Sequence, residues 1–336
     1  MKNNIPRIIG TGWSVPEKLR YNDDPIFNWL RKNIPNSAQM FDGYDVRHVL
    51  RPREDLMDIM VPAAQMALHK AGKKPKDIDI LIGLGSVSPY IQPNVLSLLH
   101  HRLGLPPSAW VIPVGNDFSN FASSLLFADA LVRAGRAENV LICIGCNWTR
   151  NVSYHTAQSI SASDGAGAAV VAMSKDESKW YVADQCTVTA SSYFGSMYTD
   201  GLKLKARPPL GGYKEVYSPH FFQITKKGAV GFKKFGAITS LTAVTDLLKK
   251  NNLTAADVSF MPHQTSSVLI DYWVKHLSPR PAQVLSTITK FANVTVATHS
   301  LNLAWYEENG NIEKDYILMM ALGPDMHCNA MLLRRH

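Results

Sequence analysis

An internal repeat restricts the fold of this chain more than any other feature of the sequence. The first copy consists of an amphipathic helix over 63–72, which ends at a glycine, and an apolar strand over 78–83. The second copy consists of a helix over 241–250 and a strand over 257–261. A unit that returns with the same order of elements predicts two related halves.

A second helix–strand unit follows each copy of the first. A helix over 121–134 precedes a strand over 140–145, and a helix over 299–309 precedes a strand over 316–321. Equivalent positions lie 176 residues apart in this unit (316 − 140) and 180 apart in the first (257 − 77). Two matched units in the same order, at nearly the same separation, make a chance repeat improbable.

The repeat predicts an α/β fold of two similar halves. Apolar strands that alternate with helices favour mostly parallel sheets with helices on both faces. Two such halves side by side give a layered pseudo-dimer, and we expect them to span 1–175 and 176–336. The segment 190–222 is richer in Tyr, Gly, Pro and Ser than its flanks, and we interpret it as an irregular or pocket-lining loop between the halves.

Composition excludes several other classes of protein. The 336 residues are 46% hydrophobic and 18% charged, which argues against disorder, and four cysteines are too few for a disulfide scaffold. Cys143 and Cys146 have a C-x-x-C spacing, but they fall in an apolar strand, which favours buried structural thiols over a redox or zinc site. The N-terminus lacks the apolar region of a signal peptide, and glycines and prolines interrupt the longest uncharged stretch, 80–101. We therefore expect a cytoplasmic protein without a membrane segment, a metal or a cofactor.

The net charge of +8, from 35 basic and 27 acidic residues, invites a search for an acidic partner. The basic residues form two clusters: Lys203, Lys205 and Arg207, and Lys226, Lys227, Lys233 and Lys234. Solvated surface is the simplest interpretation, and a docking patch for an acidic protein is the alternative. Nucleic-acid binding is not expected, because no aromatic interleaving or known module accompanies the clusters.

Five short motifs stand in an order and spacing typical of one family. They are Ile8-Ile9-Gly10-Thr11-Gly12, Asp45-Val46-Arg47, Asp164-Gly165-Ala166-Gly167-Ala168-Ala169, Pro262-His263-Gln264 and Phe291-Ala292-Asn293-Val294-Thr295. With them the chain resembles the thiolase superfamily, and within it the β-ketoacyl-acyl-carrier-protein synthase III-like group. The resemblance covers essentially the whole chain, and it implies a thiolase-like αβαβα layered fold built from two duplicated halves.

The resemblance also implies a chemistry and its partners. In the family a cysteine at a helix N-terminus takes an acyl group as a thioester, and a histidine and an asparagine stabilise the enolate formed from a malonyl unit. His263 and Asn293 hold the last two positions. The acyl group arrives on an acyl carrier protein or coenzyme A. Relatives that use coenzyme A place a tryptophan just before the Gly-Ile-Arg segment, and this chain has no tryptophan over 39–44, which puts coenzyme A use in doubt.

The chain departs from the family pattern at two positions. Phe118 stands where the family has its cysteine, and a phenyl ring is not a nucleophile. In addition, the family's glycine triplet corresponds to Gly323-Pro324-Asp325, and proline has no N–H to donate to an oxyanion. The loss of one such donor typically costs ~2.7–4 kcal/mol of transition-state stabilisation.

Three interpretations follow from these departures. In the first, Ser119 is the nucleophile and His263 its base, unless Ser119 is an ordinary helix N-cap. In the second, no covalent step occurs: His263 and Asn293 hold a thioester carbonyl while Asp117 or another group assists decarboxylation or acyl transfer, unless Asp117 is itself a helix cap. In the third, the chain is a catalytically silent subunit.

Two site residues also have simpler explanations. His263 could be a satisfied histidine at a strand end, and Asn293 could only support a turn. We favour a site role for both, because ligands bind beyond the carboxyl ends of parallel strands. The sequence therefore predicts a ketosynthase III-like acyltransferase of fatty-acid or polyketide-type biosynthesis with a non-standard active site, with Phe118, Ser119 and the other two residues in that site. We expect a homodimer or a heterodimer with a paralogue; the alternative is the silent partner of a ketosynthase heterodimer.

Overall fold

Two five-stranded sheets of identical topology form the centre of the molecule. The computed structural model describes residues 4–35, 37–90, 93–199 and 221–336. The first sheet contains β1 (Ile5–Ser14), β4 (Ile80–Ser86), β5 (Trp110–Pro113), β6 (Asn139–Cys146) and β7 (Gly165–Ser174). The second contains β8 (Tyr181–Thr189), β11 (Ser259–Pro262), β12 (Gln283–Val284), β13 (Tyr316–Gly323) and β14 (His327–Arg334).

The strand order confirms the duplication. The sheets run β1-β7-β6-β4-β5 and β8-β14-β13-β11-β12, so that each has the order 1-5-4-2-3 when its strands are numbered along the chain. The expectation of mostly parallel sheets needs a correction, because each sheet is half parallel and half antiparallel. Helical connections produce the parallel pairs, whereas β13 returns directly into β14 through a tight turn and must pair antiparallel.

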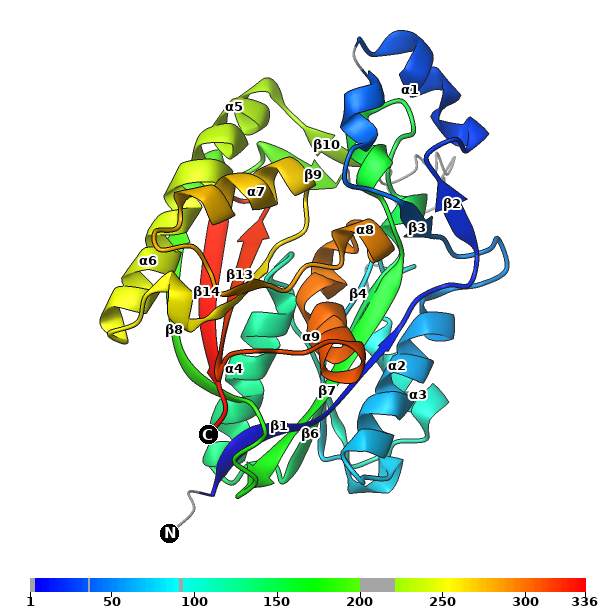
Figure 1. Cartoon of the computed structure of the whole chain (residues 1–336). Coiled ribbons are helices and arrows are strands. Elements are labelled where there is room, and N and C mark those ends of the chain that lie inside the picture. The colour runs from blue at the N-terminus through cyan, green and yellow to red at the C-terminus, as the bar shows by residue number, and fades with distance from the viewer. Residues whose placement is uncertain (1–3, 36, 91–92, 200–220) are drawn as a thin grey trace.

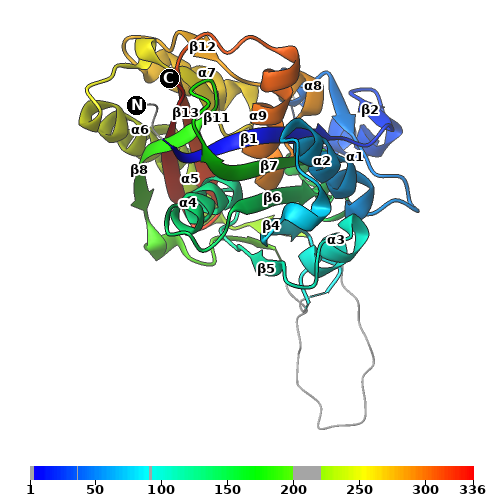
Figure 2. The same cartoon turned by 90° about the horizontal axis from the view of Figure 1, so that it is seen from below.

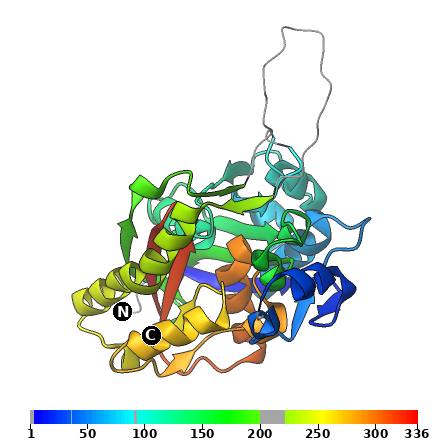
Figure 3. The same ribbon diagram turned by 90° about the horizontal axis from the view of Figure 1, so that it is seen from above.

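Helices lie in three layers around the two sheets (Figure 1). The helices outside the first sheet are α2 (Leu56–Lys70) and α3 (Leu96–Leu103), and those outside the second are α6 (Ser240–Lys250) and α7 (Ser267–His276). Between the sheets lie α4 (Asn120–Arg133) and α9 (Thr298–Asn309). The views from below and above show this α-β-α-β-α succession (Figures 2 and 3). One apolar cluster joins both sheets through α4 and α9, and separate clusters fill the two outer interfaces.

Smaller elements surround the ends of the sheets. They are β2 (Leu19–Tyr21), α1 (Asn28–Asn33), β3 (Val46–His48), β9 (Met197–Thr199), β10 (Phe222–Ile224), α5 (Lys226–Lys234) and α8 (Ile288–Phe291). A π-helical turn over Phe235–Thr239 joins α5 to α6. The predicted irregular loop 190–222 thus contributes β9 and the start of β10, and the basic cluster at Lys203, Lys205 and Arg207 lies outside the described residues.

The repeat predicts most helix and strand positions, and the largest error is the start of α2. This helix begins at Leu56 instead of residue 63, because Asp55 and Asp58 form a reciprocal capping box that starts it earlier. The glycine-rich segment behaves as expected: a Cβ on Gly167 would lie 2.3 Å from the backbone N of Leu301 in α9, so only glycine allows this close helix–sheet approach.

The described structure also bears on the domain and membrane predictions. Strands from 5–174 form one sheet and strands from 181–334 the other, while α9 of the second half packs on β1 and β7 of the first. The proposed division between 175 and 176 stays a prediction. Among the described segments, no helix has the length and apolar character needed to cross a membrane. Cys143 and Cys146 are buried free thiols, and burial raises the pKa of Cys146 to about 12.

Candidate active site

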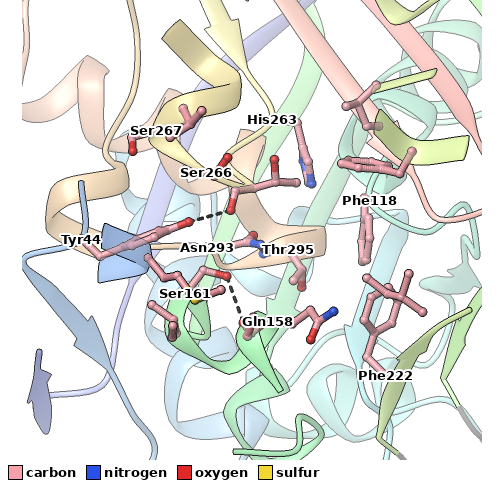
Figure 4. A pocket seen from close by; sticks show the side chains of 18 of the residues that line it. Tyr44, Phe118, Gln158, Ser161, Phe222, His263, Ser266, Ser267, Asn293 and Thr295 are labelled. Atoms are coloured by element: carbon pink, nitrogen blue, oxygen red, sulfur yellow. Dashed lines mark hydrogen bonds between the residues drawn. The ribbon is translucent and has the colours of Figure 1, made fainter. Parts of the chain in front are cut away.

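A pocket of about 380 Å³ lies where the two halves meet, and residues from both halves line it. Tyr44 and Trp148 come from the first half, and His263, Asn293 and Pro324 come from the second. Much of the remaining lining is apolar, including Met40, Ile160, Met197, Phe222, Phe232 and Leu322. Figure 4 shows His263, Phe118 and Phe222 along one side of the pocket, with Asn293 beside His263.

His263 directly follows β11 and is 1% exposed. Neither Nδ1 nor Nε2 of its ring has a hydrogen-bond partner among the described residues. Burial, together with the nearby His299 and His327, lowers the pKa of His263 to about 3. The imidazole is therefore neutral near pH 7, with one ring nitrogen as donor and the other as acceptor. A buried imidazole without partners, on the wall of a pocket, is suited to bind a polar atom of a ligand.

Asn293 is held rigidly by its backbone and by one side-chain atom. Its N–H donates to Ser161 O at 2.8 Å, and its carbonyl accepts from Ser163 N at 3.2 Å and from Trp148 Nε1 at 2.8 Å. Its Oδ1 accepts from Thr295 N at 2.8 Å. Its Nδ2 makes no such bond to any described residue, so this amide has a free donor at the pocket wall.

Gln264 fixes the loop that carries His263, and sequence reasoning did not assign it a role. This fully buried side chain accepts from Thr287 N at 2.6 Å and from Asn302 Nδ2 at 3.0 Å, and it donates to Ala292 O at 3.4 Å. It therefore ties the strand end after β11 to the loop before Asn293. We call His263 and Asn293 the polar wall.

Phe118 lines the pocket, as expected from its position before α4. Its backbone has φ 68°, a left-handed conformation that is rare for a bulky residue. Its ring stacks on His263, with ring centroids 5.5 Å apart and an interplanar angle of 16°. Gly323 and Pro324 lie on the same pocket surface. We call Phe118, Gly323 and Pro324 the blocked wall, because none of these side chains offers a nucleophile or a proton.

Ser119 is fully buried and is not among the residues that line the pocket. Its Oγ lies 2.7 Å from Nε2 of His327, and Nδ1 of His327 lies 2.5 Å from Oδ1 of Asp325. The expected pairing of Ser119 with His263 as base is therefore corrected: the serine contacts a different histidine. Nor does the Ser119 hydroxyl cap α4, although Ser119 occupies the N-cap position.

Asp117 lies in the same neighbourhood, and its side chain makes no hydrogen bond to any described residue. Desolvation of its carboxyl and the negative charge of Asp325 raise its pKa, while His327 opposes the shift. Asp117 does not line the pocket, so the predicted assistance to decarboxylation has no direct contact in this structure.

Arg47 belongs to the segment that resembles the family's Gly-Ile-Arg motif, and its side chain has a structural role in the protein interior. It is fully buried, its Nε donates to Ile160 O at 2.6 Å, and its Nη1 donates to Asn22 Oδ1. Phe27, Phe41 and Tyr44 surround its guanidinium within 6 Å. An arginine enclosed in this way cannot also contact a ligand on the surface.

Comparisons with known proteins agree with the motifs. Residues 115–188 match the model of 3-oxoacyl-[acyl-carrier-protein] synthase III, and residues 248–335 match that of its C-terminal part. A β-ketoacyl-[acyl-carrier-protein] synthase III of Clostridium perfringens is 26% identical, over 99% of this chain and all of the relative.

Solved structures show the same fold along the whole chain. The 3-oxoacyl-[acyl-carrier-protein] synthase III of Aquifex aeolicus superposes with a TM-score of 0.82 at 21% identity, covering 98% of this chain and 99% of the other. The priming β-ketosynthase of the R1128 polyketide pathway gives 0.83 at 21% identity, covering 99% and 97%. The family-model matches and the relative aligned along the whole chain show that the chain is a β-ketoacyl-acyl-carrier-protein synthase III-like protein of the thiolase superfamily, and the solved structures show that it has the same fold.

Proposed function

We propose that this protein acts on acyl thioesters by decarboxylation and direct acyl transfer, without an acyl-enzyme intermediate. The observation that carries the proposal is the polar wall: among the described residues, neither ring nitrogen of His263 nor Nδ2 of Asn293 has a hydrogen-bond partner, and both residues line one largely apolar pocket. A neutral imidazole N–H and an amide N–H are both suited to a thioester carbonyl oxygen on which negative charge develops.

The proposed step begins with a β-carboxyacyl thioester. The bond to the carboxylate breaks, carbon dioxide leaves, and the electron pair moves onto the thioester carbonyl as an enolate. His263 and Asn293 donate hydrogen bonds to that enolate oxygen, and the apolar lining strengthens both bonds by excluding water. The enolate carbon then attacks the carbonyl of a second acyl thioester, whose thiolate leaves, or it takes a proton from water when no acyl donor is present.

The blocked wall supports the absence of a covalent intermediate. The Phe118 ring fills the surface beside His263 and offers no thiol or hydroxyl that could carry an acyl group. An acyl carrier protein suits the site better than coenzyme A as the substrate's carrier, because Arg47 is enclosed by aromatic rings. On α5, Lys226, Lys227, Lys233 and Lys234 are exposed and Phe232 lines the pocket, which puts positive charge near the place where an acidic carrier would deliver its thioester.

The proposal is tested by following carbon dioxide release from a malonyl-carrier protein, together with intact-protein mass spectrometry. We expect turnover in the wild type without an acyl adduct, and a loss of about 10²–10³-fold in His263→Ala. His276→Ala is the matched control, because His276 is exposed on α7, where it hydrogen-bonds to Tyr272 O, stacks on the Tyr272 ring and does not line the pocket. Turnover that survives His263→Ala unchanged contradicts the proposal.

A second candidate is a catalytically silent subunit of a ketosynthase heterodimer, and the absence of any nucleophile or proton donor on the blocked wall favours it. In that case the purified chain shows no turnover alone. It co-purifies with a co-expressed, cysteine-bearing relative, and activity of the pair depends on the cysteine of that relative while His263→Ala in this chain has no effect.

A further inference from the structure

A hydrogen-bonded chain of three side chains stands directly behind the blocked wall. Ser119 Oγ contacts His327 Nε2 at 2.7 Å, and His327 Nδ1 contacts Asp325 Oδ1 at 2.5 Å. Ser119 is fully buried, His327 is 5% exposed, and the Asp325 side chain is about half exposed. In the tautomer that carries its proton on Nδ1, His327 donates from Nδ1–H to the Asp325 carboxylate and accepts a hydrogen bond at Nε2 from the Ser119 hydroxyl.

The Ser119 hydroxyl contacts His327 instead of capping its own helix. Ser119 occupies the N-cap position of α4, where a serine hydroxyl normally accepts a backbone N–H and stabilises the helix by about 1 kcal/mol. Its hydroxyl makes no such bond here. The contact with His327 therefore replaces a cap, which indicates a specific link between α4 and the second sheet.

The link joins two segments that form the blocked wall. Phe118 precedes Ser119 and keeps its left-handed backbone at the start of α4. The β13–β14 turn carries Gly323 and Pro324 into the pocket lining, and the His327 ring lies against Gly323 so closely that a Cβ there would be 1.9 Å from Cε1. Side-chain bonds behind the wall thus tie its two parts together.

We propose that Asp325, His327 and Ser119 act as a positioning relay that holds Phe118 and the Gly323–Pro324 turn in register, and so fixes the pocket in which the substrate carbonyl meets His263. This inference rests on the proposed function for its kinetic consequence, but not for the geometry. Ser119 is a positioning residue and not a nucleophile, because its buried hydroxyl faces His327 and lies outside the pocket lining.

Two further titratable groups face the relay. Asp117, before α4, adds negative charge near Asp325, and His263 lies close enough to His327 that His327 contributes to the lowered pKa of His263.

The test compares Ser119→Ala and Asp325→Ala with two conservative variants, Ser119→Thr and Asp325→Asn, which keep the hydroxyl and the acceptor oxygen. Hydrogen–deuterium exchange is followed in peptides that cover 116–122 and 323–327. We expect at least 10-fold faster exchange in both segments for each alanine variant, since either one breaks the relay, and near-wild-type exchange in the conservative pair. Thr187→Ala is the control, because it removes an exposed side-chain bond to Asn329 on the same sheet.

Kinetics and mass spectrometry complete the test. We expect kcat for decarboxylation to fall about 10-fold or more in Ser119→Ala, with KM within about 3-fold, because a small misplacement at a reacting centre costs rate before affinity. Faster exchange limited to the mutated segment overturns the relay, and so does an acyl adduct on Ser119, which would make it a nucleophile. If the wild type shows no turnover, the proposed function fails while the exchange data still decide on the relay.

Discussion

The two walls of the pocket use polar side chains in opposite ways. On the polar wall, the His263 ring nitrogens and the Asn293 Nδ2 have no partner among the described residues, and both residues line the cavity. Behind the blocked wall, Ser119, His327 and Asp325 are hydrogen-bonded to one another, while the wall itself presents a phenyl ring and a proline to the cavity. The polar wall therefore offers hydrogen bonds to a ligand, and the blocked wall offers it only shape.

One wall of the pocket can therefore take part in chemistry, and the other has a structural role. A buried polar group without a partner costs free energy of folding, about 1–3 kcal/mol, so such groups persist where a ligand satisfies them. A chain of polar groups that satisfy one another stabilises the fold instead. Substitutions on either wall test this difference.

The largest expected effect comes from placing a nucleophile on the blocked wall. Phe118→Cys should change the protein from no acyl adduct to one adduct per chain after incubation with an acyl thioester, because position 118 faces the pocket beside His263. The measurement is intact-protein mass spectrometry. Ser119→Cys is the matched control and should stay unmodified, since that side chain lies behind the wall. Equal labelling of both variants would show that the blocked wall does not shield position 119 from the thioester.

On the polar wall, Asn293→Asp should reduce decarboxylation about 10²-fold. The substitution keeps the oxygen that accepts from Thr295 N–H, but it replaces the free N–H donor by a carboxylate oxygen that repels a developing enolate. Steady-state kinetics measure the loss, and thermal unfolding serves as the control for folding. A variant with normal turnover would remove Asn293 from the site.

Acid should destabilise the protein through its buried histidines. Burial lowers the pKa of His263 to about 3 and that of His299 to about 4, whereas unfolded histidine titrates near 6.5. The unfolded state therefore binds more protons below pH 6.5. The stabilisation by each neutral histidine is complete above that pH and decreases as the pH falls, by about 2 kcal/mol between pH 7 and 5.

Urea unfolding at the two pH values checks this expectation. His263→Gln should lose about 2 kcal/mol less than the wild type on acidification, whereas His276→Gln, at an exposed position, should follow the wild type. An unchanged pH dependence in His263→Gln would mean that His263 is not held neutral on the polar wall.

The smallest expected effect concerns delivery of the substrate to the pocket. Reversing two charges on α5, Lys233→Glu with Lys234→Glu, should raise KM for a malonyl-carrier protein several-fold and leave KM for a malonyl-pantetheine unchanged. Lys175→Glu is the control, because Lys175 is exposed just after β7, next to the start of β1, where no residue lines the pocket. An equal rise for both substrates would locate the effect in the pocket instead of at a docking surface.

The sequence predicted the fold well where the pattern is local. The helix–strand repeat located α4, α6, α9, β6 and β13 to within about two residues, because apolar periodicity and glycine stops act over short distances. The motifs also brought His263 and Asn293 to one pocket, since each follows an element whose place in the repeat is known.

Such local patterns could not predict the contact between Ser119 and His327. Ser119 and His327 are 208 residues apart, and no local spacing connects them. The same holds for Gln264, whose partners lie on the loop that carries Asn293 and on α9. A glutamine beside a histidine gave no signal of its own, and a buried acceptor that holds a loop is visible only in the folded chain.

By itself, the sequence determined the duplicated α/β architecture, the family and the absence of a cysteine at position 118, because these depend on order and local spacing. Only the tertiary structure decided which histidine meets Ser119, which polar groups stay free for a ligand, and that Arg47 is enclosed. Each of these depends on how α4 and the β13–β14 turn pack between two sheets, and a side chain's partners are set by that packing and not by its neighbours along the chain.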